Sequence, residues 1–371
     1  MNAGLWIHDV LPDGAAVIGV FVLGFPVRRA LVHWGMFDSP NERSSHVKPT
    51  ARGGGMAMIL VAGVIGLLTD LSTIPVALLA AALGLAIISF IDDLRSISAL
   101  ARFGCHALGA VGVLAALGWP RLQLGLTPGG MIALSLPLSL AVSFLWMVGY
   151  TNAFNFMDGI NGIAAGQAVV TGLGMALLGG LTLGSFESTP VVLSLVVSGA
   201  ALGFLPHNFP TARMFMGDVG SAPLGFLLAG LVLWFAKTAG WWLIIPLALL
   251  HANFALDTGA TLLRRICRGQ RWHEAHREHF YQRLVRAGKS HAFVMLAEMA
   301  LQVVVLGLLL LYLHLGPVGR TAVIAAIIAL WTAFYLWAEM CFRRSGANRA
   351  QPVAAVLCHI RNRDEQIELG Q

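Results

Sequence analysis

The segment TNAFNFMDGING (151–162) lies between two long apolar runs, LSLPLSLAVSFLWMVGY (134–150) and IAAGQAVVTGLGMALLGG (163–180). A helix needs about 20 mostly apolar residues to cross a bilayer, and shorter runs are tolerated. The whole chain follows this pattern, because its 371 residues are 57% hydrophobic and only 11% charged, against about 25% charged residues in soluble domains. Runs this long and continuous are typical of spanning helices and not of barrel strands. We therefore expect an all-α polytopic membrane protein.

Eleven apolar stretches are candidates for membrane spans. They cover residues 10–29, 54–71, 75–91, 103–119, 131–150, 162–183, 190–206, 221–236, 240–257, 292–313 and 320–342. The first stretch lacks the basic flank and the cleavage site of a signal peptide, so we interpret it as a retained span. The predicted organisation is one polytopic domain over 1–342, followed by a basic tail over 343–371.

The lysines and arginines predict the orientation. If the N-terminus is outside and the spans alternate, only Arg121, Lys237 and Arg320 of the 24 basic residues fall in outside segments. Cytoplasmic loops carry an excess of Lys and Arg. We therefore predict an outside N-terminus, a cytoplasmic C-terminus and an active-site cleft on the cytoplasmic face.

The unusual polar stretches all fall on the predicted cytoplasmic side. In the central segment, Asn152, Asn155 and Asp158 recur at spacing three and would share one face of a helical turn. Burying such groups unpaired costs several kcal/mol, so their position at the end of a span indicates a functional site. The alternative is a polar turn built on the Asn-Gly end of the segment.

A pair of adjacent carboxylates, Asp92 and Asp93, ends the third candidate span. Such a pair is costly at a membrane boundary unless it holds a metal, meets a cation or exchanges protons. A carboxylate near another charge often has a shifted pKa and can act as a base. A solvated helix terminus is the alternative, although the helix dipole disfavours acids there.

A third acid, Asp218, lies between Gly217 and Gly220 just before the eighth candidate span. A carboxylate in such a turn suits Mg²⁺, which prefers oxygen ligands and shares them with phosphates. Asn208 and Phe215 nearby could contact a ring by hydrogen bonding and stacking. A helix N-cap is the alternative.

Two basic loops complete the set. In NERSSHVKPTARGGGM (41–56), the three glycines would let the backbone approach a ligand closely, and the loop's basic side chains, His46, Lys48 and Arg52 among them, suit a phosphate. A flexible basic loop is the alternative.

The second loop, RWHEAHREHFYQRL (271–284), has His273, His276, His279 and Gln282 at spacing three, which predicts a shared helix face. With Arg277 nearby, this pattern favours a diphosphate over a zinc ion, because the HExxH arrangement is absent. A basic interfacial helix is the alternative.

Together these five motifs resemble the polyprenyl-phosphate N-acetylhexosaminyl-1-phosphate transferases of glycosyltransferase family 4. That superfamily includes the phospho-MurNAc-pentapeptide translocase of peptidoglycan synthesis and the GlcNAc-1-phosphate transferase of O-antigen synthesis. The blocks NAFNFMDGING and FMGDVGS carry the resemblance jointly, and it extends from about residue 25 to 342. The two basic loops look closest to the branch that initiates O-antigen or related surface polysaccharides.

The resemblance implies a reaction. The 1-phosphate of an N-acetylated hexosamine would move from a UDP-sugar to undecaprenyl phosphate, with release of UMP, at the bacterial inner membrane. Mg²⁺ would be the cofactor, with Mn²⁺ as a substitute. The implied partners are the lipid phosphate, the UDP-sugar and the bilayer, with no nucleic acid, and a homodimer stays open.

The resemblance also implies roles for residues. Asp218 would be the metal ligand, and Asp92 or Asp93 would act as base at the lipid phosphate. The catalytic candidates are Asp92, Asp93, Asp158, His276 and His279, and the substrate-binding candidates are Asn152, Asn155, Asn161, Asn208, Phe215, His46, Lys48, Arg52 and Arg277. Asn161 departs from the family pattern, which commonly has a second Asp there.

Two other functions compete with this interpretation. A phospho-MurNAc-pentapeptide transferase would carry adjacent histidines where this chain has the separated His276 and His279. An ion-coupled secondary transporter would carry polar groups near the membrane midplane and on broken helices, whereas the polar motifs of this sequence gather at one face. The identity of the sugar, and the choice between direct attack and a covalent aspartyl intermediate, stay open.

Overall fold

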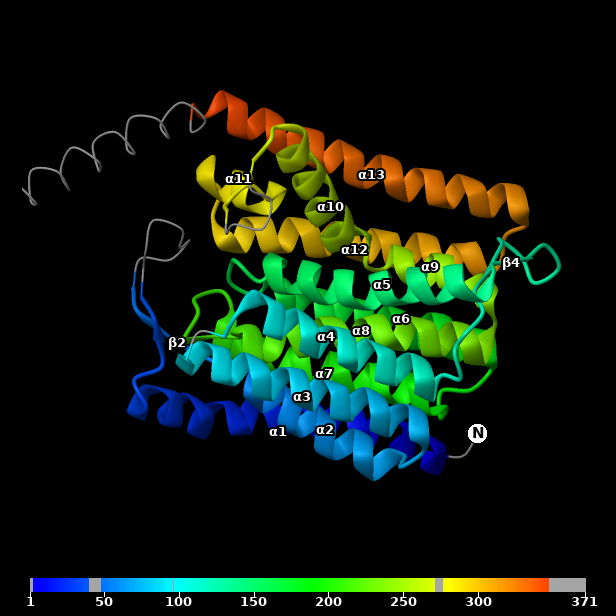
Figure 1. Ribbon diagram of the computed structural model, residues 1–371, viewed down its shortest axis with the longest axis horizontal. Coiled ribbons are helices and arrows are strands. Elements are labelled where there is room, and N and C mark those ends of the chain that lie inside the picture. Colours follow the sequence, from blue (N-terminus) through cyan, green and yellow to red (C-terminus); the bar gives the residue numbers. More distant parts are fainter. Residues whose placement is uncertain (1–2, 40–47, 96, 271–275, 347–371) are drawn as a thin grey trace, which may run out of the picture.

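The computed structural model describes residues 3–39, 48–95, 97–270 and 276–346, with side chains from residue 12 onward. Within these residues, nine helices are long and apolar enough to cross a membrane, and they lie side by side in one bundle (Figure 1). They are α1 (Ala3–His33), α3 (Thr73–Arg95), α4 (Ala99–Ala116), α5 (Leu136–Met157), α6 (Ile163–Leu183), α7 (Thr189–Asn208), α8 (Asp218–Ala239), α12 (His291–Leu313) and α13 (Pro317–Arg344). The prediction of an all-α polytopic membrane protein is confirmed.

Two of the eleven predicted spans differ from the others. The second, α2 (Gly55–Thr69), has only 15 residues. The ninth is interrupted: a 3-10 turn, η1 (Trp241–Leu243), leads into α9 (Ile244–Leu249), and α9 and α10 (Ala252–Cys267) meet at a bend of 72°. The structure therefore has a helix at each predicted stretch, but among the described residues nine single helices meet the spanning test, or ten spans if the bent pair counts as one.

The bend after α9 exposes a backbone carbonyl inside the bundle. Leu250 O accepts hydrogen bonds from Gln167 Nε2 at 3.1 Å, from Thr171 Oγ1 at 3.3 Å, and from the side-chain amide of Gln302. Non-helical backbone is tolerated at membrane depth only where it finds such partners. Side chains of α6 and α12 thus hold the bend and fix the direction of α10.

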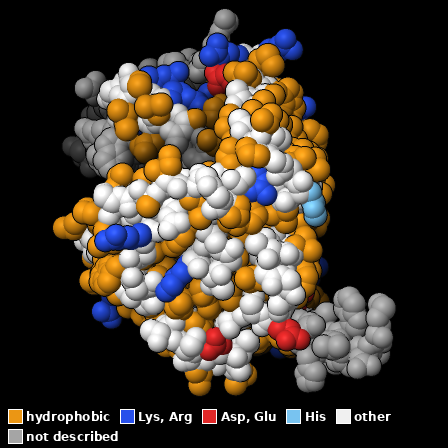
Figure 2. Space-filling view, turned by 90° about the vertical axis from the view of Figure 1, so that its right-hand side faces the viewer, with side chains coloured by type: hydrophobic (Ala, Val, Ile, Leu, Met, Phe, Trp, Pro, Cys, Tyr) orange, Lys and Arg blue, Asp and Glu red, His pale blue; other side chains and the backbone are white. Residues whose placement is uncertain are grey.

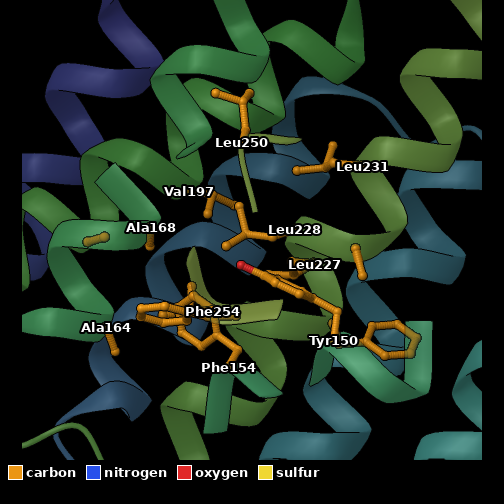
Figure 3. Packing of buried hydrophobic residues seen from close by; sticks show 14 of the residues in the cluster. Tyr150, Phe154, Ala164, Ala168, Val197, Leu227, Leu228, Leu231, Leu250 and Phe254 are labelled. Atoms are coloured by element: carbon orange, nitrogen blue, oxygen red, sulfur yellow. The ribbon is translucent and has the colours of Figure 1, made fainter. Parts of the chain in front are cut away.

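The core of the bundle surrounds α8, which is buried along its length. Side chains of α5, α6, α7, α8 and α10 meet there, among them Tyr150, Phe154, Leu227 and Phe254 (Figure 3). The outer helices expose many of their large apolar side chains instead, as lipid-facing surfaces do. The central position of α8 means that its first residue is surrounded by other elements.

Short strands mark the two ends of the bundle. At one end β1 (Phe37–Asp38) pairs antiparallel with β2 (Thr50–Arg52), and β2 pairs parallel with β5 (Met214–Phe215). The register puts Arg52 opposite Phe215, three residues before α8 begins. At the other end β3 (Gln123–Leu124) and β4 (Ile132–Ala133) form a hairpin.

The basic residues assigned to opposite sides lie at opposite ends. At the β3–β4 end, Lys237 Nζ donates to Leu117 O at 2.8 Å, and Arg320 donates to Leu126 O. Hydrophobic and uncharged atoms dominate the surface there (Figure 2). At the β2–β5 end, Arg28 Nε donates to Arg213 O at 3.2 Å. Of the predicted tail, residues 347–371 lie outside the described residues.

Candidate active site

Three carboxylates from two helices converge at the start of α8. Asp92 and Asp93 lie in the last turn of α3, and Asp218 is the first residue of α8. Arg52 lies among them, with its Nη2 2.9 Å from Asp218 Oδ1 and 3.4 Å from Asp93 Oδ1. The pairing of β2 with β5 positions this arginine, because β5 leads directly into α8. Acidic side chains and a basic one, Arg52, from three predicted motifs therefore form one site.

A second arginine, which the sequence motifs missed, completes the group. Arg102 Nη1 is 2.8 Å from Asp92 Oδ2 and 3.9 Å from Asp218 Oδ2. Asp92 Oδ1 also accepts a hydrogen bond from Ile97 N at 2.6 Å. The available signal is a basic residue ten positions after Asp92, which in the sequence alone indicates only the cytoplasmic side. We call Asp92, Asp93, Asp218, Arg52 and Arg102 the Asp218 cluster.

The glycines of the first basic loop are buried, and the expectation that they approach a ligand is wrong. Gly53 N and Gly54 N both donate to Phe215 O, at 3.2 and 2.9 Å. A Cβ at Gly55 would lie 2.3 Å from Gly220 Cα, which only glycine avoids. These glycines allow β2 and α2 to approach the start of α8, and so they serve the site by positioning Arg52 and Asp218.

The central segment meets the cluster through its last turn. Ser221 Oγ of α8 donates to Asn155 Oδ1 at 2.5 Å, which joins α5 to the helix that carries Asp218. Asp158 follows the end of α5 and is half-buried. Burial and the nearby Asp218 carboxylate raise the pKa of Asp158 to about 7, although Arg52 opposes the shift. A fourth carboxylate thus lies within electrostatic reach of the cluster.

Two amides of the segment are engaged with the protein itself. Asn152 Nδ2 donates to Val148 O at 2.7 Å and lies 3.5 Å from His106 Nδ1. Asn161 Nδ2 donates to Pro210 O at 3.0 Å, so it contacts the loop before β5. This loop is the one that delivers Asp218 to the site.

Asn208 was expected to contact a ring of the substrate, and its placement argues otherwise. Its side chain is only 3% exposed. Its Oδ1 accepts from Gly162 N at 2.6 Å, and its Nδ2 donates to Met214 O at 3.0 Å. Both ends of the amide are therefore used by the backbone. We correct its assignment from substrate contact to a positioning residue that ties the central segment to β5.

The remaining described substrate-binding candidates at this end of the bundle are more exposed. Phe215 is half-buried beside Arg52 in the parallel register. Lys48 is exposed, and its carbonyl accepts a hydrogen bond from Thr50 Oγ1 at 3.1 Å. His46 lies outside the described residues.

The histidine loop does not form the predicted helix over its described part. Residues 276–279 are irregular, and α11 (Phe280–Arg286) begins only afterwards. His279 is extended at the start of α11, and its N–H donates to Gln282 Oε1 at 3.3 Å. The shared helix face of His276 and His279 is therefore wrong, although their rings still lie 5.0 Å apart. His273 lies outside the described residues.

A buried aspartate of α10, which none of the sequence motifs includes, holds this loop. Asp257 Oδ1 is 3.0 Å from His279 Nδ1, and Asp257 Oδ2 accepts from Phe280 N at 2.9 Å and Tyr281 N at 3.4 Å. The carboxylate also accepts from Thr261 Oγ1 at 3.2 Å and is fully buried. Asp257 thus fixes the start of α11. We call Asp257, His279 and the first turn of α11 the Asp257 anchor.

Tyr281 connects the Asp257 anchor to the central segment. Its hydroxyl donates to Phe156 O at 3.1 Å, in the last turn of α5. A Cβ at Gly159 would lie 2.1 Å from this hydroxyl, so the segment passes directly against the tyrosine. The histidine loop and the Asp218 cluster therefore flank the same polar segment.

The two described histidines of the loop contribute hydrogen bonding and Arg277 contributes charge. Burial, together with His279 and Arg265, lowers the pKa of His276 to about 4. His276 is therefore neutral at pH 7. Arg277 lies beside it, half-buried, and Arg286 donates to the Arg277 carbonyl at 3.2 Å. Positive charge in this loop comes from Arg277, and His276 can offer a neutral hydrogen-bonding ring.

The donor set of the Asp218 cluster fits a magnesium ion that is shared with a ligand. Among the described residues, no three His, Cys, Asp or Glu side chains are close enough to enclose a metal. Mg²⁺ is commonly held by one or two carboxylates plus substrate phosphates. Asp218 and Asp93 provide such oxygens, and Asp93 Oδ2 is buried without a hydrogen-bond partner in the described part of the chain. This orphaned acceptor is what a cation or a proton would satisfy.

Comparison with known proteins gives the same family along most of the chain. The model of glycosyl transferase family 4 matches residues 75–236. The decaprenyl-phosphate N-acetylglucosaminephosphotransferase of Mycobacterium tuberculosis is 33% identical, with 80% of each chain covered. A protein of Bacillus subtilis named a probable undecaprenyl-phosphate N-acetylglucosaminyl 1-phosphate transferase is 31% identical over 77% of this chain and 79% of its own. The phospho-N-acetylmuramoyl-pentapeptide-transferase of a Synechococcus strain is 35% identical over 62% of this chain and 70% of its own.

Proposed function

Because this chain belongs to glycosyl transferase family 4, we propose that it transfers a sugar 1-phosphate from a UDP-sugar to undecaprenyl phosphate and releases UMP. The sugar is an N-acetylated hexosamine, for which the printed names of the mycobacterial and Bacillus relatives give N-acetylglucosamine as the first to test. The product starts the assembly of a lipid-linked O-antigen or related envelope polysaccharide. The reaction takes place on the cytoplasmic face of the inner membrane.

The observation that supports this proposal most strongly is the Asp218 cluster. Its carboxylates come from the ends of two membrane helices and meet two guanidinium groups, Arg52 and Arg102. The proposed reaction brings two phosphate-bearing anions together, so it needs cations that offset their repulsion and groups that fix their positions. The cluster lies at the end of the bundle, where a lipid phosphate and a soluble nucleotide can both arrive.

Asp218 would hold Mg²⁺ or Mn²⁺ in this site, with Asp93 beside it. When bound, the cation would neutralise charge on the diphosphate of the UDP-sugar. Arg52 is paired with both of these carboxylates. With a cation held at Asp218, the Arg52 guanidinium would be available for phosphate oxygens, which a guanidinium can bind in bidentate fashion. The same arginine thus stabilises the site before the substrate arrives and binds the substrate afterwards.

Asp93 is the better candidate for the base of the two adjacent acids. Asp92 has both oxygens engaged, by Arg102 and by Ile97 N. Asp93 keeps Oδ2 without a partner among the described residues. A free carboxylate oxygen can accept the proton of an incoming lipid phosphate, whereas an occupied one serves to position Arg102. Direct attack by the lipid phosphate, with Asp93 as proton acceptor, is the mechanism we propose.

The histidine loop would contact the other end of the donor substrate. A neutral His276 can donate or accept a hydrogen bond, and Arg277 adds positive charge beside it. Asn155 and Asp158 lie between this loop and the Asp218 cluster along the chain of contacts through Tyr281. The diphosphate would therefore lie along the central segment, with its sugar toward the loop.

One assay tests the reaction. Purified protein is incubated with labelled UDP-N-acetylglucosamine, undecaprenyl phosphate and Mg²⁺, and labelled lipid and UMP are measured. We expect both products in equal amounts. Asp218→Asn should lower the rate about 10²- to 10³-fold, because it removes a charge that acts on the transferred phosphate. Glu187→Gln, at an exposed acid between α6 and α7, is the matched control and should leave the rate unchanged.

Two outcomes would contradict parts of the proposal. Failure to form labelled lipid from a panel of UDP-N-acetylhexosamines, with either Mg²⁺ or Mn²⁺, would reject the reaction. A phosphorylated Asp92 or Asp93, trapped when undecaprenyl phosphate is withheld, would reject direct attack.

A second candidate function is supported by the Synechococcus relative, whose printed name gives a phospho-N-acetylmuramoyl-pentapeptide transferase. The match to that relative covers a smaller share of this chain than the match to the mycobacterial protein. UDP-MurNAc-pentapeptide therefore belongs in the same panel. Preferential turnover of that substrate would replace the first proposal by the second.

A further inference from the structure

A separate cavity lies between α10, α11 and α13, away from the residues of the Asp218 cluster. It has a volume of about 530 Å³, within the range of small-molecule sites. Its walls combine apolar and basic side chains of α10 and α13. The apolar ones include Leu256, Ile328 and Leu336, and the basic ones are Arg264, Arg268 and Arg343. An apolar wall with arginines at the end of the helices is suited to a ligand that is both apolar and anionic.

The cavity has more positive than negative charge. Glu339 is the one carboxylate among the described residues that line it. That carboxylate is already occupied, because it accepts from Arg283 and also from Arg343 Nε at 2.7 Å. Arg264 and Arg268 are therefore not neutralised by an acid of the lining.

The surroundings of Arg264 favour the binding of an anion. Its guanidinium carbon lies 4.7 Å from the centroid of the Phe280 ring, within the range of a cation–π contact. Its Nη1 is buried and has no hydrogen-bond partner in the described part of the chain. A buried N–H donor without a partner is costly, so a guanidinium that turns toward an acceptor in the cavity would gain a hydrogen bond.

The apolar part of the cavity opens toward the lipid. Leu336 is 60% exposed and Ile328 is 47% exposed, on the surface of the bundle that spanning helices turn to the bilayer. A soluble anion would gain nothing from these side chains, whereas an acyl chain would bury them. A zwitterionic headgroup would bring its own cation next to the arginines.

We propose that this cavity binds an anionic phospholipid of the surrounding bilayer, of the phosphatidylglycerol class. Its phosphate contacts Arg264, Arg268 and Arg343, and its acyl chains lie along α10 and α13. The lipid is a bound component and not a substrate, and its site does not depend on the reaction proposed above. Because α10 also carries Asp257, the lipid braces the helix that positions the histidine loop.

The test measures lipid retention by the full-length protein. The protein is placed in nanodiscs of phosphatidylcholine with one-fifth phosphatidylglycerol, and the lipids that stay bound after gentle release are identified by native mass spectrometry. We expect one retained phosphatidylglycerol. The double variant Arg268→Gln/Arg343→Gln should weaken retention roughly 25-fold, from about fivefold for each basic side chain near an anionic lipid.

Matched variants separate the cavity from general surface charge. Arg29→Gln/Arg344→Gln removes the same charge from exposed positions that do not line the cavity, and it should retain the lipid. Leu336→Trp fills the apolar part while leaving the arginines intact, and it should lose the lipid without a change in melting temperature larger than that of the control.

Several outcomes would overturn the proposal. They are equal retention of phosphatidylcholine and phosphatidylglycerol, equal loss in the control pair, and binding of inorganic phosphate alone with the affinity of the lipid. Displacement of phosphatidylglycerol by an equal amount of undecaprenyl phosphate would make the cavity a site for the polyprenyl substrate. Dissociation of a protein dimer in the cavity variants would make it a subunit interface. Either result would also reject the proposal.

Discussion

The Asp218 cluster and the Asp257 anchor both place aspartates against positive groups or N–H donors. They differ in whether the carboxylate oxygens can still bind a ligand. In the cluster, the carboxylates belong to helix ends and are partly exposed, with side-chain exposures of 24% for Asp218 and 10% for Asp93. In the anchor, Asp257 is fully buried and its oxygens accept from His279, Thr261 and two backbone N–H groups.

This difference teaches how to separate a binding carboxylate from a positioning one. The cations around Asp218 are arginine side chains, which can turn to a phosphate when another cation takes their place. Two of the four donors around Asp257 are backbone N–H groups at the start of a helix, which cannot leave without unfolding α11. Variants of the first kind should change the rate while stability is kept, and variants of the second kind should change stability and substrate affinity together.

The largest effect is expected for the acid with an unused oxygen. Asp93→Asn should lower kcat about 10³-fold, because a general base contributes roughly 10²- to 10⁴-fold. Asp92→Asn should cost less, because its main contact, Arg102, can still bind the amide oxygen. The melting temperature of both variants, measured beside the rates, should stay near that of the wild type. A greater loss in Asp92→Asn than in Asp93→Asn would reverse the two assignments.

Removing the anchor should have the next largest effect. Asp257→Ala leaves two N–H groups and His279 without their acceptor, so we expect a loss of about 3 kcal/mol in stability. Because His279 and the loop before it shift, KM for the UDP-sugar should rise roughly 30-fold, with a smaller change in kcat. Asp257→Asn keeps one acceptor oxygen and should recover part of both effects.

A matched control distinguishes positioning from simple loss of stability. Asp70 also accepts hydrogen bonds, from Ser72 N at 2.7 Å and Thr189 Oγ1 at 2.8 Å, but at the opposite end of the bundle. Asp70→Ala should lower the melting temperature and leave KM unchanged. An equal rise of KM in this variant would mean that Asp257 has no specific role in the site.

The pH dependence of metal binding gives a smaller effect that concerns the cluster alone. Burial and Asp218 raise the pKa of Asp158 to about 7, above the value of about 3.9 in an unfolded chain. Protonation of Asp158 therefore stabilises the metal-free fold as pH falls through 7. Above pH 7 the buried carboxylate is ionised, and its burial then lowers the stability of the metal-free fold by the full amount. The charged and titratable groups around it are Asp218 of α8, Arg52 of β2 and Tyr281 of α11.

A cation at Asp218 competes with this proton. Mg²⁺ affinity, measured by the shift in melting temperature across a titration, should therefore rise up to about tenfold between pH 6 and pH 8. Asp158→Asn should remove most of the rise. A rise of the same size in Asp158→Asn would assign the proton to another group.

The sequence predicted much of this arrangement because its signals were local. The apolar runs located every spanning helix, and the spacing of Asn155 and Asp158 placed them at one helix end. Contacts between distant segments carried no such signal. Arg102 reached Asp92 only through the turn between α3 and α4, and Asp257 became important only because the helix bends at Leu250. The three glycines indicated close approach correctly, but their neighbour proved to be α8 instead of a ligand.

The bend also revises the argument against a transporter. Polar side chains inside the bundle, Gln167, Asn253 and Gln302, do accompany a broken helix, which the one-sided polar motifs had not predicted. Their hydrogen bonds are directed at Leu250 O and at each other, so they account for the bend itself. Family membership, together with this structural role, favours the transferase over the transporter.

The smallest effect is expected where the two regions touch. Tyr281→Phe removes the hydrogen bond from the tyrosine hydroxyl to Phe156 O, which should cost about 1 kcal/mol and raise KM a few-fold. Gly159→Ala would drive a methyl group against the same hydroxyl. If Tyr281 sets the distance between the anchor and the central segment, removing its hydroxyl makes room for that methyl group. The double variant should then lose less stability than the sum of the single losses. Strict additivity in thermal unfolding would mean that the two regions are positioned independently, and that the histidine loop does not take its place from the segment beside the cluster.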